Sequence, residues 1–229
     1  MIYPIQTILP LCFPEDTQDV VKEDIPDLGP LHLHLCKGIE FTSKHQLPIV
    51  KPNHIVPPEE ITTLSRLKNV ASNKKKRLFA HFYTADKNFE KVWNRPFSYI
   101  KTFKSLAGII STDYSILTNM VESQRQWNDF RNKLLAAFYQ RYGVSVIASP
   151  SWSDDLHNIE RYMEGWPRES VIAINSTGVC HDKRAKKTWL DGYWAMYNIL
   201  HPTHILRYGG FIEGEMADIS TYYVNNNRV

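Results

Sequence analysis

Short runs of apolar residues alternate with amphipathic stretches along the second two thirds of the chain. Each run is five or six residues long and is bounded by polar residues or glycine, which is typical of a buried strand. The runs occupy residues 78–83, 108–112, 144–148, 170–174 and 204–208, and residues 219–224 could add an edge strand. Successive runs begin 26 to 36 residues apart, which is the length of a βα unit.

The stretches between these runs carry a helical pattern. The strongest one covers residues 123–142, where Trp127, Phe130, Leu134 and Phe138 recur at spacings of three and four, and Gly143 follows as a helix-ending glycine. Alternating strands and helices predict an α/β fold with a mostly parallel sheet of about five to six strands. The pattern leaves two arrangements open, an open doubly wound sheet and a partial barrel of the TIM type.

The first third of the chain lacks this regularity. Nine of the 13 prolines fall within residues 1–58, and each proline removes a backbone donor and restricts the residue before it. We therefore predict an irregular, proline-rich extension at residues 1–77, packed on a βα-repeat domain at residues 78–229.

Two short elements are predicted within this extension. Residues 31–36 alternate leucine with histidine, which indicates a strand. Pro57 and the two glutamates after it are typical of a helix start, and Ile61, Leu64 and Leu67 follow at helical spacing.

Composition predicts the class of protein and its cellular compartment. The chain has 43% hydrophobic and 22% charged residues, as in soluble globular proteins, and contains no apolar run long enough to span a bilayer. The start of the chain lacks the features of a secretory signal. Cys12, Cys36 and Cys180 form no disulfide or metal-binding pattern. These features predict a protein of the cytoplasm without membrane contact, with cysteines as small core residues.

Charge is distributed unevenly along the chain. Residues 66–104 carry eleven basic and two acidic residues, a net charge of +9 on a chain whose total is +3. Such a local excess suggests a polyanionic or acidic partner.

Polar residues that follow the predicted strands are the candidates for chemistry, because the carboxyl ends of parallel strands share one edge. Asp113, Tyr114 and Ser115 follow the second run, and we expect them to act in catalysis together with Asp154 as a second carboxylate. The competing interpretation is that these residues cap the segments after the strands.

A second set of candidates lies on the long predicted helix and in the loop after the third strand. Arg125, Asn128 and Asn132 share one helix face, where a guanidinium and two amides could grip a phosphate or carboxylate. Ser151 and Trp152 follow the third strand and complete the predicted substrate-binding set. The competing interpretation of the helix face is simple solvent exposure.

A third set is basic and indicates contact with nucleic acid. Lys87, Lys91 and Arg95 recur every four residues, with the aromatic residues Phe89, Trp93, Phe97 and Tyr99 between and beyond them. The predicted nucleic-acid-binding residues are Lys74, Lys75, Lys76, Arg77, Lys87, Lys91 and Arg95. The alternative is that the aromatic residues form the core face of a helix.

Several common motifs are absent from the sequence. It contains no GxGxxG or GxxxxGK[ST] phosphate loop, no GxSxG nucleophile elbow and no HExxH zinc motif. The commonest nucleotide-binding enzymes are therefore disfavoured. No metal site is predicted, and the cofactor, if there is one, is unknown.

Five motifs occur in order along the chain and carry a resemblance to a known family. They are Trp93-Asn-Arg-Pro, Ser111-Thr-Asp-Tyr-Ser115, Arg125-Gln-Trp-Asn-Asp-Phe-Arg131, Tyr139-Gln-Arg-Tyr-Gly143 and Val146-Ile-Ala-Ser-Pro-Ser-Trp152. From about residue 79 to about residue 208 the chain resembles the domain of unknown function 4417 family, met in phages, plasmids and bacterial genomes. The resemblance leaves out the proline-rich first third.

The resemblance implies a phage or mobile-element source and no particular activity. It adds Trp127, Arg131 and Gln140 to the positions of interest, of which Gln140 joins the substrate-binding candidates. The family tends to have Tyr-Trp-Gln near the end of the long helix, where this chain has Phe138-Tyr-Gln.

Three hypotheses about function follow. The first is an enzyme-like βα domain acting on a phosphorylated or nucleotide-type substrate in the cytoplasm of a bacterial host. The second is a non-catalytic accessory factor in replication or counter-defence that binds nucleic acid or a host protein through the basic region. The third is an assembly protein that forms a homo-oligomer through exposed aromatic residues.

Overall fold

The computed structural model describes residues 29–179 and 182–223, apart from the side chains of Pro30 and Leu156. The chain forms two compact units, residues 1–38 and residues 39–229. The proposed boundary between residues 77 and 78 falls inside the second unit. Cys12 and Cys180 lie outside the described residues, and Cys36 is a buried free thiol.

The described part of the first unit consists of two 3-10 turns, Gly29–Leu31 and Leu33–Cys36. The strand predicted at residues 31–36 is therefore wrong. His32 joins the turns in the left-handed conformation, with φ of 47°, so the backbone cannot extend through the alternating leucines.

The described residues of the second unit contain seven strands. They are β1 (Glu60–Thr63), β2 (Leu78–His81), β3 (Gly108–Ile110), β4 (Val146–Ile147), β5 (Val171–Asn175), β6 (His204–Tyr208) and β7 (Ser220–Tyr223). Its helices are α1 (Ser72–Lys75), α2 (Glu90–Asn94), α3 (Pro96–Lys104), α4 (Glu122–Arg141), α5 (Ile159–Met163) and α6 (Lys183–Leu200). The 3-10 turns are Leu64–Asn69, Asp86–Asn88 and Leu156–Asn158.

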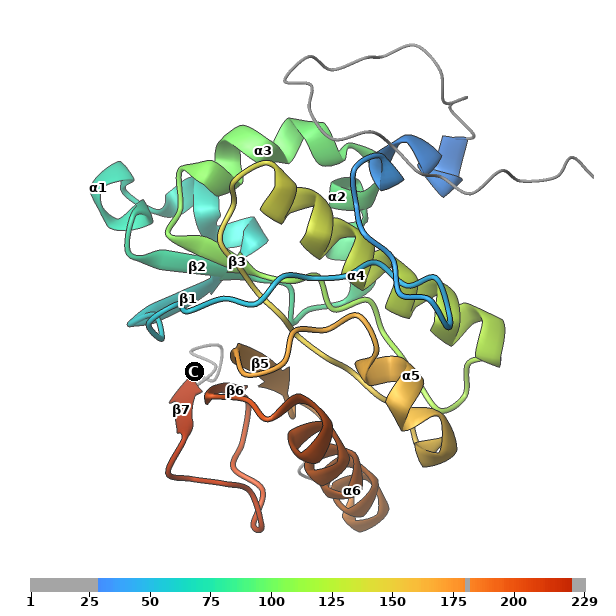
Figure 1. Cartoon of the computed structure of the whole chain (residues 1–229). Coiled ribbons are helices and arrows are strands. Elements are labelled where there is room, and N and C mark those ends of the chain that lie inside the picture. Colours follow the sequence, from blue (N-terminus) through green and yellow to red (C-terminus); the bar gives the residue numbers. More distant parts are fainter. Residues whose placement is uncertain (1–28, 180–181, 224–229) are drawn as a thin grey trace, which may run out of the picture. The chain divides into compact units, whose positions relative to one another are not determined.

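All strand pairs are parallel, which confirms the predicted α/β fold with a parallel sheet. The strands form a four-stranded sheet in the order β1-β2-β3-β4 and a three-stranded sheet in the order β5-β6-β7. A single parallel bridge between Ala148 and Ile172 connects the two sheets. In Figure 1, α3 and α4 lie on one side of β2 and β3, and α6 lies beside β5 and β6.

The count of five to six strands was too low because β1 was predicted as a helix. Its core sequence, Ile61-Thr-Thr, is β-branched throughout, and β-branched side chains lose little freedom in a strand. The apolar spacing that suggested a helix is divided between this strand and the 3-10 turn Leu64–Asn69, where Leu64 and Leu67 are buried.

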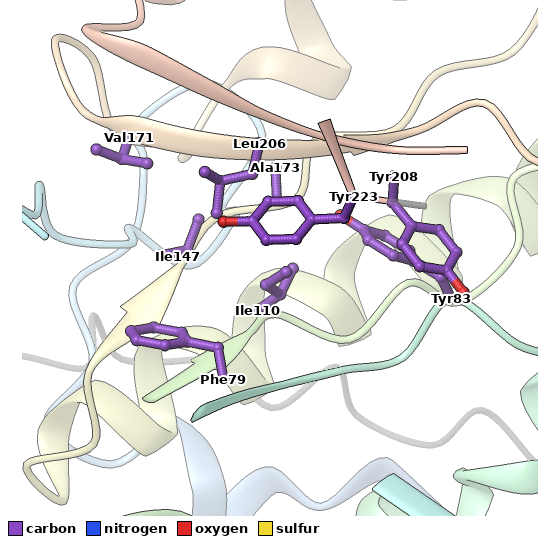
Figure 2. Close-up of a cluster of buried hydrophobic side chains, with 9 residues drawn as sticks. All are labelled: Phe79, Tyr83, Ile110, Ile147, Val171, Ala173, Leu206, Tyr208 and Tyr223. Carbon is purple, nitrogen blue, oxygen red and sulfur yellow. The ribbon is translucent and has the colours of Figure 1, made fainter. Parts of the chain in front are cut away.

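Six of the strands, together with the turn after β2, contribute to one apolar interior. Figure 2 shows the side chains that converge there: Phe79, Tyr83, Ile110, Ile147, Val171, Ala173, Leu206, Tyr208 and Tyr223. Gly108 makes this packing possible, because a Cβ at that position would lie 2.3 Å from the Phe79 ring. Among the described residues, no helix has both the length and the apolarity required to cross a bilayer.

Candidate active site at the carboxyl ends of the strands

The inward-facing positions at the carboxyl ends of the strands are aromatic or polar. Tyr83 and Tyr208 stack with their ring centroids 5.0 Å apart, beside the aliphatic part of the interior cluster (Figure 2). His81 packs against both rings, at 5.3 Å from Tyr83 and 4.5 Å from Tyr208. Ser149 and Asn175 follow the same two-residue alternation as Ile147 and Ala173 beneath them.

Asp113 follows β3 at the carboxyl ends of the strands. Its half-buried carboxylate accepts a hydrogen bond from the Ser151 hydroxyl at 2.7 Å, and the Asn175 side chain is near enough to lower the pKa of the carboxyl. These three residues follow or end β3, β4 and β5, which are consecutive strands. The structure therefore brings Asp113 and Ser151 into contact, while their roles in a site stay predictions.

The environment of Asp113 favours its protonated form. Burial raises the pKa of its carboxyl to about 6, and the nearby charge of Asp86 acts in the same direction. The hydrogen bond from Ser151 and the influence of the nearby Asn175 side chain oppose this rise without cancelling it. A carboxyl group with a pKa near neutrality can both donate and accept a proton under cellular conditions.

Buried hydroxyl groups surround the Asp113 loop. The Tyr83 hydroxyl lies 3.0 Å from the Ser149 hydroxyl, and the Ser149 amide donates to the Ser111 hydroxyl at 2.9 Å. Burial and the charge of Asp113 raise the pKa of Tyr83, so its phenol stays protonated at neutral pH. Thr112 is 1% exposed, and its hydroxyl has no hydrogen-bond partner among the described residues.

His81 is a neutral member of the group. Burial, helped by the positive charge of Arg66, lowers the pKa of its imidazole to about 4. The Tyr83 amide donates to its Nδ1 at 3.3 Å, so the ring proton resides on Nε2. The predicted site residues did not include His81, Ser149 or Asn175. The alternation of inward and outward positions along each strand was the signal that could have identified them.

The structure places Tyr114 and Ser115 in anchoring contacts beside the site. The Tyr114 ring is fully buried, with the Arg131 guanidinium 3.7 Å from its centroid and Phe89 at 4.7 Å. The Ser115 hydroxyl donates to Asp86 at 2.9 Å. Both contacts fix the loop that carries Asp113.

The amides on α4 hold the same loop. The Asn132 side chain accepts from the Tyr114 amide at 2.8 Å and donates to the Tyr114 carbonyl at 3.2 Å. Asn128 donates to the Ser115 carbonyl at 2.7 Å. The side-chain amides of Asn128 and Asn132, which were predicted to bind substrate, are therefore hydrogen-bonded to the backbone of this loop. Arg125, one turn earlier, makes a 3.5 Å contact with the Thr118 carbonyl.

Three further candidates lie apart from Asp113 or on its margin. Gln140 forms two hydrogen bonds with the backbone of Lys51, at 2.9 and 3.0 Å. Asp154 is exposed and has no hydrogen bond to a described residue. Trp152 packs against α6 so closely that a Cβ on Gly192 would lie 2.1 Å from the indole nitrogen.

The basic candidates fall into two groups, one before β2 and one after it. Lys74, Lys76, Arg77, Lys87, Lys91 and Arg95 are exposed, and Lys75 is partly exposed. They lie on α1, on α2 and in the turns beside these helices. Within the described ranges, no group of three or more histidine, cysteine, aspartate or glutamate side chains could hold a metal ion.

Comparison with known proteins links the chain to phages. It is 26% identical over 178 residues to the Gene 1 protein of Mycobacterium phage L5, covering 77% of this chain and 76% of the phage protein. It is 23% identical over 178 residues to the Gene 1 protein of Mycobacterium phage D29, covering 77% of this chain and 65% of that protein. No solved structure matches the chain significantly.

A family model described as Domain of unknown function (DUF4417) matches residues 39–224. The match begins at the first residue of the second compact unit. It therefore includes residues 39–78, which the motif-based resemblance had left out. Because the model covers most of the chain, the protein belongs to the DUF4417 family.

Proposed function

We propose that this phage-related protein is an enzyme-like βα domain in which Asp113 transfers a proton to or from a phosphorylated or nucleotide-type substrate. The observation that carries the proposal is the placement of Asp113, which is half-buried, hydrogen-bonded to Ser151 after β4 and close to Asn175 at the end of β5. In parallel α/β folds this end of the sheet is the usual place for ligands. The site would act in the cytoplasm of a bacterial host.

The architecture that best supports such a site is a partial barrel. The strands follow one another in chain order, whereas a doubly wound sheet reverses its order at a switch point. Strands β2 to β7 share one interior, and the Tyr223 hydroxyl on β7 donates to the Pro58 carbonyl just before β1. This contact brings the last strand back toward the first.

An anionic substrate suits the charges at this end of the sheet. Arg66 is exposed and follows β1, and its positive charge reaches this end of the strands. It adds to the effect of burial in lowering the pKa of His81, and it opposes the rise that burial causes in the pKa of Tyr208. If the phosphate of a small substrate lay near Arg66, the rest of the substrate would lie over the polar side chains of Tyr83, Ser149 and Asn175. Guanidinium groups bind phosphate with directed, charge-assisted hydrogen bonds.

The test is a binding map by amide NMR with a panel of nucleoside monophosphates and sugar phosphates. We expect one class to shift the signals of Asp113, Ser151 and Asn175 in a saturable way. Asp113→Asn should weaken that binding by about tenfold or more, because a charged hydrogen-bonding group is lost. Asp218→Asn removes an exposed carboxylate near the amino end of β7 and is the matched control.

Asp154→Asn belongs in the same set, since it tests whether Asp154 supplies the predicted second carboxylate. Equal binding by the Asp113 and Asp218 variants, or ligand shifts confined to another part of the molecule, would refute the proposal.

A second candidate function is supported by the pairing of the two acidic residues in the basic region, residues 66–104. Asp86 is engaged by Ser115, and Glu90 pairs with Arg131 at 3.0 Å. Lys87, Lys91 and Arg95 form no ion pair with any carboxylate of the described chain. The positive charge of this surface is therefore available to a partner.

The break between α2 and α3 shapes this surface. Pro96 ends the first helix and starts the second, and the bend forms a hollow of about 400 Å³ lined by Lys91, Asn94, Arg95, Ser98 and Tyr99. Cations beside an aromatic ring match the phosphate and base of single-stranded nucleic acid. We propose such a strand, ahead of an acidic host protein, as the partner of this surface.

Fluorescence anisotropy with a labelled single-stranded oligonucleotide tests this candidate. Lys87→Glu, Lys91→Glu and Arg95→Glu combined should abolish binding, and the wild-type protein should show a log–log salt slope of about −2 for three phosphate contacts. Lys183→Glu, Lys186→Glu and Arg184→Glu combined place the same charge change on α6 as a control. Equal loss in both triple variants, or binding that ignores salt, would reject the candidate. Homo-oligomer formation stays a prediction, for which the mass in solution is the relevant measurement.

A further inference from the structure

A second hollow, of about 540 Å³, lies at the opposite end of the strands from Asp113. Its lining includes residues 163–166 and Arg168, which precede β5, and residues 198–201, which precede β6. Because the strands are parallel, these segments lie at the amino ends of the sheet, whereas Asp113 follows the carboxyl end of β3. The hollow is therefore separate from the candidate active site.

The charged groups around this hollow are mostly unpaired cations. Lys44, Arg161 and Arg168 line it and form no ion pair with a described carboxylate. The lining contains two acidic residues, Glu160 and Glu164. The Glu164 carboxylate already contacts the backbone amide and the ring of His45, so Glu160 is the one lining carboxylate without a described partner. The hollow thus offers hydrogen-bond donors in excess of free acceptors.

Trp166 is an independent indication of a ligand. It lines the hollow and is only 6% exposed, yet its indole Nε1 has no hydrogen-bond partner among the described residues. An indole N–H can only donate, so the group that completes it must bring an acceptor oxygen. Burying such a donor without a partner is unfavourable by an amount comparable to a lost hydrogen bond.

Apolar surface accompanies these donors. Met163 and Leu200 are buried and contribute to the wall together with the Trp166 ring. The buried Lys133 ammonium lies 5.2 Å from the centroid of the Trp166 ring and pairs with Asp129. A ligand that fits all of these groups has an oxyanion at one end and an apolar or aromatic body.

We infer that the hollow between α5 and the end of α6 binds a small organic oxyanion, with its phosphate or carboxylate on Arg161 and Arg168 and its apolar body against Trp166. The site does not depend on the function proposed for Asp113. A ligand held there would contact the segments that lead into β5 and β6.

Indole NMR of the full chain tests the inference. Each of the six tryptophans has one indole N–H, and Trp166→Phe identifies the signal of Trp166 by its loss. Phenyl phosphate and benzoate are the organic probes, and inorganic phosphate is the probe without an apolar body. We expect a saturable shift of the Trp166 signal with at least one organic probe, and affinity reduced about tenfold by Arg161→Gln or Arg168→Gln. Arg184→Gln, on the first turn of α6, should change nothing.

Each other outcome overturns the inference. The absence of a saturable shift refutes the site, and unchanged affinity in both arginine variants refutes the oxyanion contact. Inorganic phosphate that binds as tightly as phenyl phosphate refutes the apolar contact. Asp113→Asn should leave the Trp166 titration unchanged, and a loss of binding in that variant would assign the probe to the other end of the sheet. This control separates a failure here from a failure of the proposed function.

Discussion

Replacing Arg207 by methionine should lower the free energy of unfolding by about 3–5 kcal/mol. The Arg207 and Glu215 side chains are both fully buried and form an ion pair. The guanidinium also donates to the Ile174 carbonyl at 3.3 Å and the Gly210 carbonyl at 3.2 Å, and lies 4.6 Å from the centroid of the Trp189 ring. Methionine would leave the Glu215 carboxylate buried without its countercharge.

The exposed pair on α6 provides the matched control. Lys187 and Asp191 are also paired, at 2.6 Å, but the lysine side chain is 78% exposed. Lys187→Met should therefore lower the free energy of unfolding by no more than about 1 kcal/mol in the same urea titration. Adding Glu215→Leu to Arg207→Met should recover part of the loss, because it removes the stranded charge. If Arg207→Met and Lys187→Met lowered the free energy of unfolding by equal, small amounts, the buried pair would contribute no more to stability than the exposed pair.

Strand positions could be predicted because buried strands have continuous apolar runs in the sequence. The runs at residues 78–83, 108–112 and 170–174 are apolar on both faces, as strands covered by helices must be. β1 could not be recognised in this way, since Glu60 is exposed and the other three residues are only partly buried. Its strand character comes from pairing with β2, which is a tertiary contact.

The candidate site was predictable to the extent that it depends on strand ends. Asp113 and Ser151 follow apolar runs, and the structure joins them by a hydrogen bond. Asn128 and Asn132 show the limit of this reasoning. Their spacing fixes the helix face they share, but only the fold determines that the backbone of Tyr114 and Ser115 occupies that face.

The long helix gives a second example of this limit. α4 spans Glu122–Arg141, within a residue of the predicted helix, and Leu134 and Phe138 are buried as expected. Asp129 and Lys133 are buried as well, paired with each other one turn apart. Charged residues at this spacing usually lie on a solvated face, so their burial could not be read from the pattern.

Replacing Asp113 by asparagine should make the protein more stable at about pH 8 and not at about pH 4. Burial raises the pKa of the folded-state carboxyl to about 6, above an unfolded value of about 3.9. Between these values the folded state binds more protons, so stability falls as pH rises. Above about pH 6 the ionised carboxylate disfavours folding by roughly 1–3 kcal/mol, which asparagine removes.

The measurement is a urea titration of both proteins across this pH range, with Asp218→Asn as the control. Asp218 is exposed, so its replacement should change stability by less than about 0.5 kcal/mol at every pH. A difference between wild type and Asp113→Asn that stays constant with pH would mean that Asp113 is an ordinary capping residue. A destabilisation that grows toward high pH would mean the same, because a cap is strongest when ionised.

The central claim is that the fold holds Asp113 ready to exchange a proton, and its own titration tests this most directly. The side-chain carboxyl of Asp113 can be followed by carbon-13 NMR, with its signal assigned by its loss in Asp113→Asn. The structure predicts a midpoint of about 6, set by burial against the hydrogen bond from Ser151 and the influence of Asn175. A midpoint at or below about 4 would show an ordinary surface carboxylate and would contradict the account.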